Sequence, residues 1–230
     1  MADPVLAGKK IAVLLESQYI AHEIRTYRQR FEGYGASVEL MSRLWGNPTI
    51  TFVSEVEDAG GTPETLAVGI DFANVAPADY AAIIMAANYP SVRLRWVEPP
   101  PGQPMSAGMA RTAPAVEFFH RAMQDKRIVK AAPCHGLWLL TPVPEVLAGR
   151  KVTCNPVVLA DVVNTGAEFV PPPLGGDWAR HVVVDDDLVT STSAHSVEIV
   201  EAFVDAVRDR ILAMSAASGQ VPAAAGRPVL

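Results

Sequence analysis

The chain alternates between short, continuous apolar runs and segments in which apolar residues recur at helical spacing. Residues 10–15 form a near-continuous apolar run, which is typical of a strand buried on both faces. Apolar side chains then recur every three or four positions, at Ile20, Ile24, Tyr27 and Phe31. This spacing predicts a helix, and glycines at 33 and 35 end it before a second short strand at 37–41. The chain therefore begins with a strand–helix–strand unit.

The same alternation continues to about residue 212. Further strands are predicted at 79–85, 127–133, 151–154 and 169–170. Hairpins are predicted within 46–70 and across 181–191. Further helices are predicted to begin at about 112 and to cover 157–163 and 195–212. The segment 98–104 is rich in proline, which predicts a loop because proline donates no main-chain hydrogen bond. Alternating strands and helices predict a flavodoxin-like, three-layer α/β/α sandwich around a mostly parallel sheet. We expect one domain over 1–214 and a low-complexity Ala/Pro/Gly tail over 215–230.

A cysteine follows one of these buried strands, in the sequence Ala-Pro-Cys134-His135-Gly136. The pattern predicts a strand, a sharp turn with a strained backbone, and a helix, which together form a nucleophile elbow. Such a turn places a side chain at the carboxyl edge of the sheet, where open α/β sheets bind ligands. A helix N-terminus there favours the thiolate, so Cys134 is a candidate nucleophile. The alternative is that Cys134 is a small buried core residue, which is what we expect of Cys154.

Composition and charge narrow the class of partner. The chain has 230 residues, of which 50% are hydrophobic, and a net charge of −6 with no basic run, so we expect neither nucleic acid nor an anionic membrane as a partner. Two cysteines suggest neither a disulfide framework nor a zinc site. No run approaches the ~20 apolar residues of a membrane span. We expect a soluble cytoplasmic protein with a small-molecule substrate.

The segment 132–140 resembles the nucleophile elbow of the DJ-1/PfpI superfamily, which has the class I glutamine amidotransferase-like fold. The resemblance covers about residues 8–213, and it is carried also by the segments 10–15, 19–24, 148–153, 164–170 and 187–191. It implies that Cys134 is the nucleophile and that Glu23 is the acid near its sulfur. His135 matches the histidine that follows the cysteine in the PfpI-like branch. A carboxyl beside a thiolate has a raised pKa and can exchange a proton during catalysis.

The resemblance also suggests the positions that contact a substrate. It implies that the main-chain N–H groups of Ala87 and Cys134 face a developing oxyanion. The oxyanion and substrate-binding positions are then Ala87, Asn88, Ser91, Gly136 and His195. Members of the superfamily usually form dimers or larger assemblies, which implies a homodimer or higher homo-oligomer. The resemblance implies no metal and no organic cofactor.

Two departures from the family pattern bear on the reaction. Ala86-Ala87 stands where many members have two glycines, and Ser91 stands where the PfpI-like branch has a glutamate that orients the histidine. No paired His and Glu appear near 80–95, as the metal-binding branch would need. These differences count against a peptidase and leave the chemistry of the site open.

The leading hypothesis is a cysteine-dependent hydrolase or lyase that acts on a small electrophilic carbon. The carbon is either a carbonyl, as in glyoxalase-like and deglycase-like relatives, or a C–N group, as in hydratases and amidohydrolases such as those that hydrate isonitriles. Cys134 would add to that carbon, and Glu23 or His135 would transfer the proton. One alternative is a non-enzymatic redox or stress-response protein in which Cys134 is an oxidation sensor. Another is a binding module that keeps the fold without the chemistry.

Overall fold

The computed structural model describes residues 4–56, 61–217 and 219, and it is built on a central seven-stranded sheet with the strand order β10-β11-β7-β6-β1-β2-β5. The strands of this sheet are β1 (Lys10–Leu14), β2 (Ser37–Ser42), β5 (Ile70–Asp71), β6 (Ala82–Met85), β7 (Val129–Pro133), β10 (Val182–Asp185) and β11 (Leu188–Ser191). Neighbouring strands are parallel except for the β10–β11 hairpin. The predicted mostly parallel α/β sheet is confirmed.

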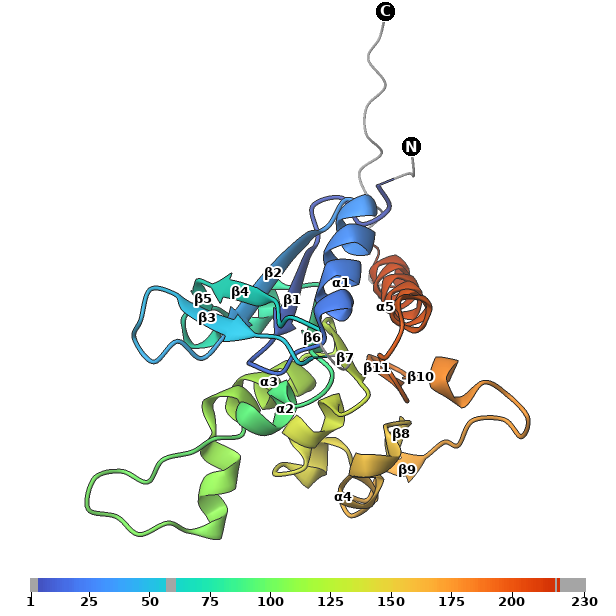
Figure 1. Cartoon of the computed structure of the whole chain (residues 1–230). Helices are drawn as coiled ribbons and strands as arrows, with labels where there is room; N and C mark the ends of the chain where they lie inside the picture. Colours follow the sequence, from blue (N-terminus) through green and yellow to red (C-terminus); the bar gives the residue numbers. More distant parts are fainter. Residues whose placement is uncertain (1–3, 57–60, 218, 220–230) are drawn as a thin grey trace, which may run out of the picture.

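Helices flank the sheet on both sides. They are α1 (Ala21–Gly33), α2 (Pro90–Arg93), α3 (Pro114–Gln124), α4 (Leu159–Val163) and α5 (Val197–Ala217). Figure 1 shows α1 and α5 packed together on one side of the sheet and α3 on the other. Between these layers, the central strands β1, β6 and β7 are buried almost throughout, as expected for strands covered on both faces. Among the described residues, no helix is long and apolar enough to cross a membrane.

Two small sheets complete the fold. The hairpin predicted within 46–70 is present as β3 (Ile50–Val53) and β4 (Thr65–Val68), which pair antiparallel outside the central sheet. Strands β8 (Lys151–Val152) and β9 (Glu168–Phe169) form a short parallel pair. The predicted proline-rich loop is observed between α2 and α3, apart from a 3₁₀ helix at Ala107–Thr112.

Some predicted boundaries were wrong for local reasons. The helix after Cys134 is a five-residue 3₁₀ helix, Gly136–Leu140, and Pro142, which has no main-chain N–H to donate, does not extend it. The last helix begins at Val197 instead of 195, where Ser196 accepts the N–H of Ile199. That helix runs to Ala217, so the first residues of the predicted 215–230 tail are helical, whereas residues 218 and 220–230 lie outside the described residues.

Candidate active site

Cys134 sits on a tight turn at the end of β7. Its φ is 54°, in the left-handed region that costs a residue with a side chain about 1–2 kcal/mol. Two main-chain bonds hold the turn: the Cys134 N–H donates to the Ser191 carbonyl at 2.8 Å, and the Cys134 carbonyl accepts the Asn155 N–H at 3.0 Å. The strained elbow predicted at this cysteine is confirmed. Strain of this kind is typical of functional sites.

Three adjacent parallel strands end in turns that meet at this edge of the sheet. Gln18 follows β1, Asn88 follows β6 and Cys134 follows β7, and all three have positive φ values, of 67°, 66° and 54°. The Asn88 side chain joins two of the turns by donating to the Gln18 carbonyl at 2.9 Å. It also donates to the carboxylate of Glu55. The turns after these three strands therefore converge at one edge of the sheet.

Glu23 lies in the first turn of α1, and its side chain is completely buried. The carboxyl accepts the Ala87 N–H with both oxygens, at 3.0 and 3.1 Å, and the Tyr27 hydroxyl at 2.7 Å. Burial raises the pKa of Glu23 to about 7, while the bonds from Ala87 and Tyr27 favour the charged form and oppose that rise. Glu23 can therefore release and take up a proton near neutral pH.

The thiol of Cys134 is also completely buried. Its pKa is raised to about 12, first by burial and then by the negative charge of Glu23. The Asn88 and His135 main-chain N–H groups and the Asn155 side chain favour the thiolate, but they do not offset these two effects. The expectation that a helix N-terminus makes Cys134 a thiolate is therefore wrong for the free protein. The 3₁₀ helix that follows is too short to outweigh the loss of solvent.

The N–H groups that surround the sulfur differ from those implied by the family resemblance. The Ala87 N–H is bonded to Glu23 and the Cys134 N–H to Ser191, so neither faces a substrate. Instead, the N–H groups of Asn88 and His135 lie beside the sulfur. Main-chain donors in this position stabilise negative charge on the sulfur or on an atom bonded to the carbon that it attacks.

His135 is 7% exposed, and its ring lies between two aromatic side chains. The ring centroids of Tyr89 and Trp138 are each 5.9 Å from that of the imidazole. Burial lowers the pKa of His135, whereas the Asn155 side chain raises it. The ring is therefore neutral at pH 7, and its buried Nδ1 has no hydrogen-bond partner among the described residues. A neutral imidazole with an unoccupied nitrogen can accept or relay a proton.

The remaining predicted positions lie around the same turns. The buried Ser91 hydroxyl donates to the Asn88 carbonyl at 3.2 Å, which holds the turn after β6. A Cβ on Gly136 would lie 3.1 Å from the Ala132 Cβ, so glycine permits the close packing of the elbow. His195 is near enough for its charge to lower the pKa of His135. That any of these residues contacts a substrate stays a prediction.

Sequence reasoning did not find Tyr27 and Asn155 as parts of this site. Tyr27 carried a usable signal, because it lies four residues after Glu23 and therefore on the same face of α1. Asn155 follows a different strand, and only the packing of that segment against the elbow brings it near Cys134. Among the described residues, no cluster of three His, Cys, Asp or Glu side chains is arranged to hold a metal ion.

Comparison with known proteins bears on the family and the fold of this chain. Residues 99–206 match the DJ-1/PfpI family, which confirms the predicted superfamily. A search of the curated proteins found no match.

Several solved structures share the fold. A two-domain protein from Anabaena variabilis with DJ-1/ThiJ/PfpI-like and ferritin-like domains is 19% identical, with a TM-score of 0.66 over 88% of this chain and 48% of that one. This chain thus spans about half the length of the Anabaena protein. A ThiJ/PfpI domain protein from Brachyspira murdochii is 14% identical (TM-score 0.62; 90% and 98% covered), and Schizosaccharomyces pombe DJ-1 is 12% identical (TM-score 0.60; 93% and 100% covered). At these identities the likeness shows the fold.

Proposed function

We propose that this chain, which has the DJ-1/PfpI superfamily fold and matches that family over the segment containing its elbow, is a cysteine-dependent enzyme acting on a small electrophilic carbon. Cys134 is the nucleophile, and Glu23 and His135 move the protons. The carbon belongs to a carbonyl, as in glyoxalase-like or deglycase-like reactions, or to a C–N group, as in hydration or amide hydrolysis. The reaction class is thus that of a hydrolase or lyase.

The observation that supports this proposal most is the pairing of two buried acids with very different pKa values. The Glu23 carboxyl has a pKa of about 7, and the Cys134 thiol has one of about 12. Near neutral pH the thiol keeps its proton, whereas a large share of the Glu23 carboxyl is ionised and available to accept one. Transfer from the thiol to this weaker base is unfavourable by itself, so it accompanies formation of the C–S bond when a substrate arrives. Pairs of titratable groups whose surroundings separate their pKa values are typical of catalytic acids and bases.

The steps follow from these positions. The sulfur electron pair forms the C–S bond as the thiol proton passes to Glu23, and the π electrons of the attacked bond move to its oxygen or nitrogen. The N–H groups of Asn88 and His135 stabilise the charge that forms there. The developing anion then takes a proton from Glu23 or through the imidazole of His135. Coupling proton transfer to attack avoids an isolated thiolate in a buried site.

The test uses the two cysteines of the chain as a matched pair, because both are buried and their thiol pKa values are both raised. Wild type, Cys134→Ala and Cys154→Ser would be assayed against small glyoxals, amides and isonitriles, with circular dichroism confirming the fold. We expect Cys134→Ala to lose at least a thousandfold in turnover and Cys154→Ser to keep it. Equal turnover in wild type and Cys134→Ala would reject the mechanism, as would no turnover of any compound by the wild type.

A second candidate, an oxidation sensor, is favoured by the three donors around the sulfur. These donors are the Asn88 N–H, the His135 N–H and the Asn155 side chain, all of which favour a thiolate. The same groups would donate hydrogen bonds to the oxygen of an oxidised cysteine. Burial and the raised pKa of Cys134 count against this candidate, because the thiolate is the nucleophile that attacks peroxide. Peroxide titration with mass spectrometry separates the two candidates. Selective oxidation of Cys134 at low peroxide, without turnover of any electrophile, would favour the sensor.

A further inference from the structure

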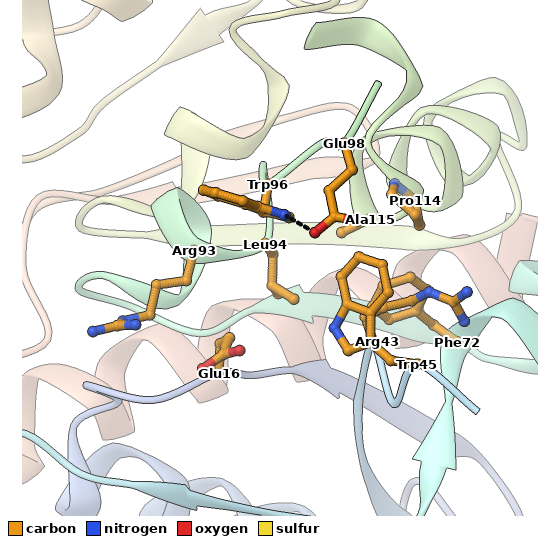
Figure 2. Close-up of a pocket in the computed structure, with 10 residues that line it drawn as sticks. All are labelled: Glu16, Arg43, Trp45, Phe72, Arg93, Leu94, Trp96, Glu98, Pro114 and Ala115. Carbon is orange, nitrogen blue, oxygen red and sulfur yellow. Dashed lines mark hydrogen bonds between the residues drawn. The ribbon is translucent and has the colours of Figure 1, made fainter. Parts of the chain in front are cut away.

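A cavity of about 470 Å³ opens at the same edge of the sheet, and its lining does not include Cys134, Glu23 or His135. Figure 2 shows its walls, which come from the segments after β1, β2 and β5, from the end of α2 and the segment after it, and from the start of α3. Its size falls within the range of cavities that bind small molecules. The side chains that matter are Glu16, Trp45, Phe72, Arg93, Trp96 and Glu98.

Trp45 is the most unusual residue of this cavity. Its φ is 52°, in a region that bulky side chains rarely adopt, and its side chain is 52% exposed. Strained backbone and exposed indole surface both cost stability, and such features persist where the surrounding structure enforces them for a function. Trp45 thus combines a strained backbone with exposed aromatic surface in the lining of a cavity, a combination typical of functional sites.

A rigid support behind Trp45 fixes its indole. The guanidinium of Arg43 lies 5.1 Å from the centre of the Trp45 ring. Asp71, which is 7% exposed, accepts Arg43 at 2.6 Å, the Leu44 N–H at 3.0 Å and the Ala73 N–H at 2.9 Å. These bonds pin the arginine and, through it, the tryptophan. A side chain ordered in advance loses little freedom when a ligand binds.

A second tryptophan lies on another wall. Trp96 is 61% exposed, and its indole N–H donates to Glu98 at 3.3 Å, as the dashed line in Figure 2 marks. Phe72 adds a third aromatic ring to the lining. Aromatic walls in a concave site bind planar rings through stacking and the burial of their faces.

Glu16, Arg93 and Glu98 surround these rings, and the described hydrogen bonds of these three side chains go to neutral partners. Arg93 donates through Nε and Nη2 to the Gln18 amide oxygen, at 3.0 and 2.9 Å. The Glu16 carboxylate accepts the neighbouring Ser17 N–H, and Glu98 accepts the Trp96 indole N–H. A carboxylate only accepts hydrogen bonds and a guanidinium only donates them. The cavity therefore suits a ring that carries both N–H donors and an acceptor.

We propose that this cavity binds a planar nitrogen heterocycle with adjacent N–H donors and a carbonyl acceptor, of which guanine is a simple example. The ring packs against Trp45 and Trp96, its N–H groups donate to Glu16 or Glu98, and its carbonyl accepts from Arg93. Arginine with a guanine carbonyl and carboxylate with a base amino group are established pairings, and stacking on aromatic side chains binds bases. The proposal does not depend on the chemistry at Cys134.

The test is calorimetric titration of the full chain with guanosine, inosine and uridine. Guanosine should bind saturably, inosine at least fivefold more weakly because it lacks the exocyclic amino group, and uridine more weakly still because its ring is smaller. Trp45→Ala and Trp96→Ala should each weaken guanosine binding at least tenfold. Trp178→Ala is the matched control, because this 48% exposed tryptophan lies outside the cavity lining, and its guanosine affinity should stay within twofold of wild type.

Further variants separate loss of binding from loss of folding. Trp45→Phe and Trp96→Phe retain an aromatic face, so they should bind guanosine more tightly than the alanine variants do. If the alanine variants fail to fold, the phenylalanine variants still test the role of the rings. Cys134→Ala should bind guanosine as wild type does, whatever its turnover. The absence of saturable binding would overturn the proposal, as would equal losses in the Trp96 and Trp178 variants. A dimer in sedimentation that Trp96→Ala dissociates, without guanosine binding, would instead show these walls to be an interface between copies.

Discussion

The main-chain N–H of Ala87 donates to both carboxyl oxygens of Glu23, at 3.0 and 3.1 Å. Ala87 belongs to the turn after β6 and Glu23 to α1, so this bond ties the acid to the turn that carries Asn88. The amide therefore positions the proposed acid instead of facing a substrate. The same contact opposes the rise in the pKa of Glu23 that burial causes.

Tyr27→Phe should raise the pKa of Glu23 above its value of about 7. The Tyr27 hydroxyl donates to the carboxyl at 2.7 Å and favours its charged form, and a hydrogen bond to a charged group contributes about 1.5–3 kcal/mol, or roughly 1–2 pKa units. A ¹³C NMR titration of labelled glutamate side chains measures the change. Tyr34→Phe is the control, because that tyrosine follows the same helix but donates to Asp205. Equal pKa values in wild type and Tyr27→Phe would contradict the assignment.

Glu23 should make the protein less stable as pH rises. Its pKa is about 7 in the folded state against an ordinary value of 4.5, so the folded state keeps a proton that the unfolded state loses between these pH values. The contribution to the free energy of unfolding is thus full below pH 4.5 and falls by about 3 kcal/mol as pH rises through 7. Urea denaturation of wild type and Glu23→Gln at several pH values measures it. We expect their difference in stability to change by this amount, whereas parallel pH profiles would refute it.

Gly136→Ala should destabilise the fold by about 1–3 kcal/mol, because small-to-large changes in packed positions force neighbours apart. The new Cβ would lie 3.1 Å from the Ala132 Cβ and 3.3 Å from the Met85 carbonyl oxygen. Gly33→Ala in α1 has open space around it and should be neutral or stabilising by up to ~1 kcal/mol. Chemical denaturation of both variants compares them. Similar effects at the two glycines would show that the elbow does not need the close approach.

Asp187→Ala should be strongly destabilising. The carboxylate pairs with the ammonium of Lys130, and both side chains are completely buried. Removing one partner of a buried ion pair leaves an uncompensated charge and costs about 3–5 kcal/mol. Lys126 also pairs with Asp187, but its own side chain is 62% exposed. Lys126→Ala should therefore lower the free energy of unfolding by at most ~1 kcal/mol.

The double variant Lys130→Met/Asp187→Ala distinguishes charge from packing. It should recover part of the stability lost in Asp187→Ala, because no unpaired ammonium then remains in the core. Thermal and urea unfolding of the three variants provides the comparison. A double variant no more stable than Asp187→Ala would show that lost packing, and not the buried charge, is responsible.

Much of the fold was predictable because its signals are local. The apolar run at 10–15 and the helical spacing after it place β1 and α1 within one residue of their observed bounds, since burial on both faces or on one stripe leaves a periodic trace. The elbow was predictable for the same reason, as Cys134 follows a buried strand directly. The 3₁₀ form of the short helix after it was not, because that depends on how the segment packs against the rest of the fold.

The partners within the site were far less predictable. The separation along the chain between Glu23 and Ala87, or between Arg43 and Asp71, carries no periodic signal. Each contact exists because separate strands end at one edge of the sheet. The resemblance to a family supplied Glu23, and it misassigned the N–H of Ala87. The cavity around Trp45 had no sequence signature, since a tryptophan with positive φ looks like any other in the sequence.

The sequence by itself determined the order of strands and helices, and with it a parallel sheet that brings Cys134 to its carboxyl edge. Only the tertiary structure decided the state of that cysteine. Burial and the neighbouring charge of Glu23 raise its pKa, and the turns after β6 and β7 determine which main-chain N–H groups reach its sulfur. The reason is physical: strand and helix formation depends on residues close in the chain, whereas solvation and charge depend on every group packed nearby, however distant in sequence.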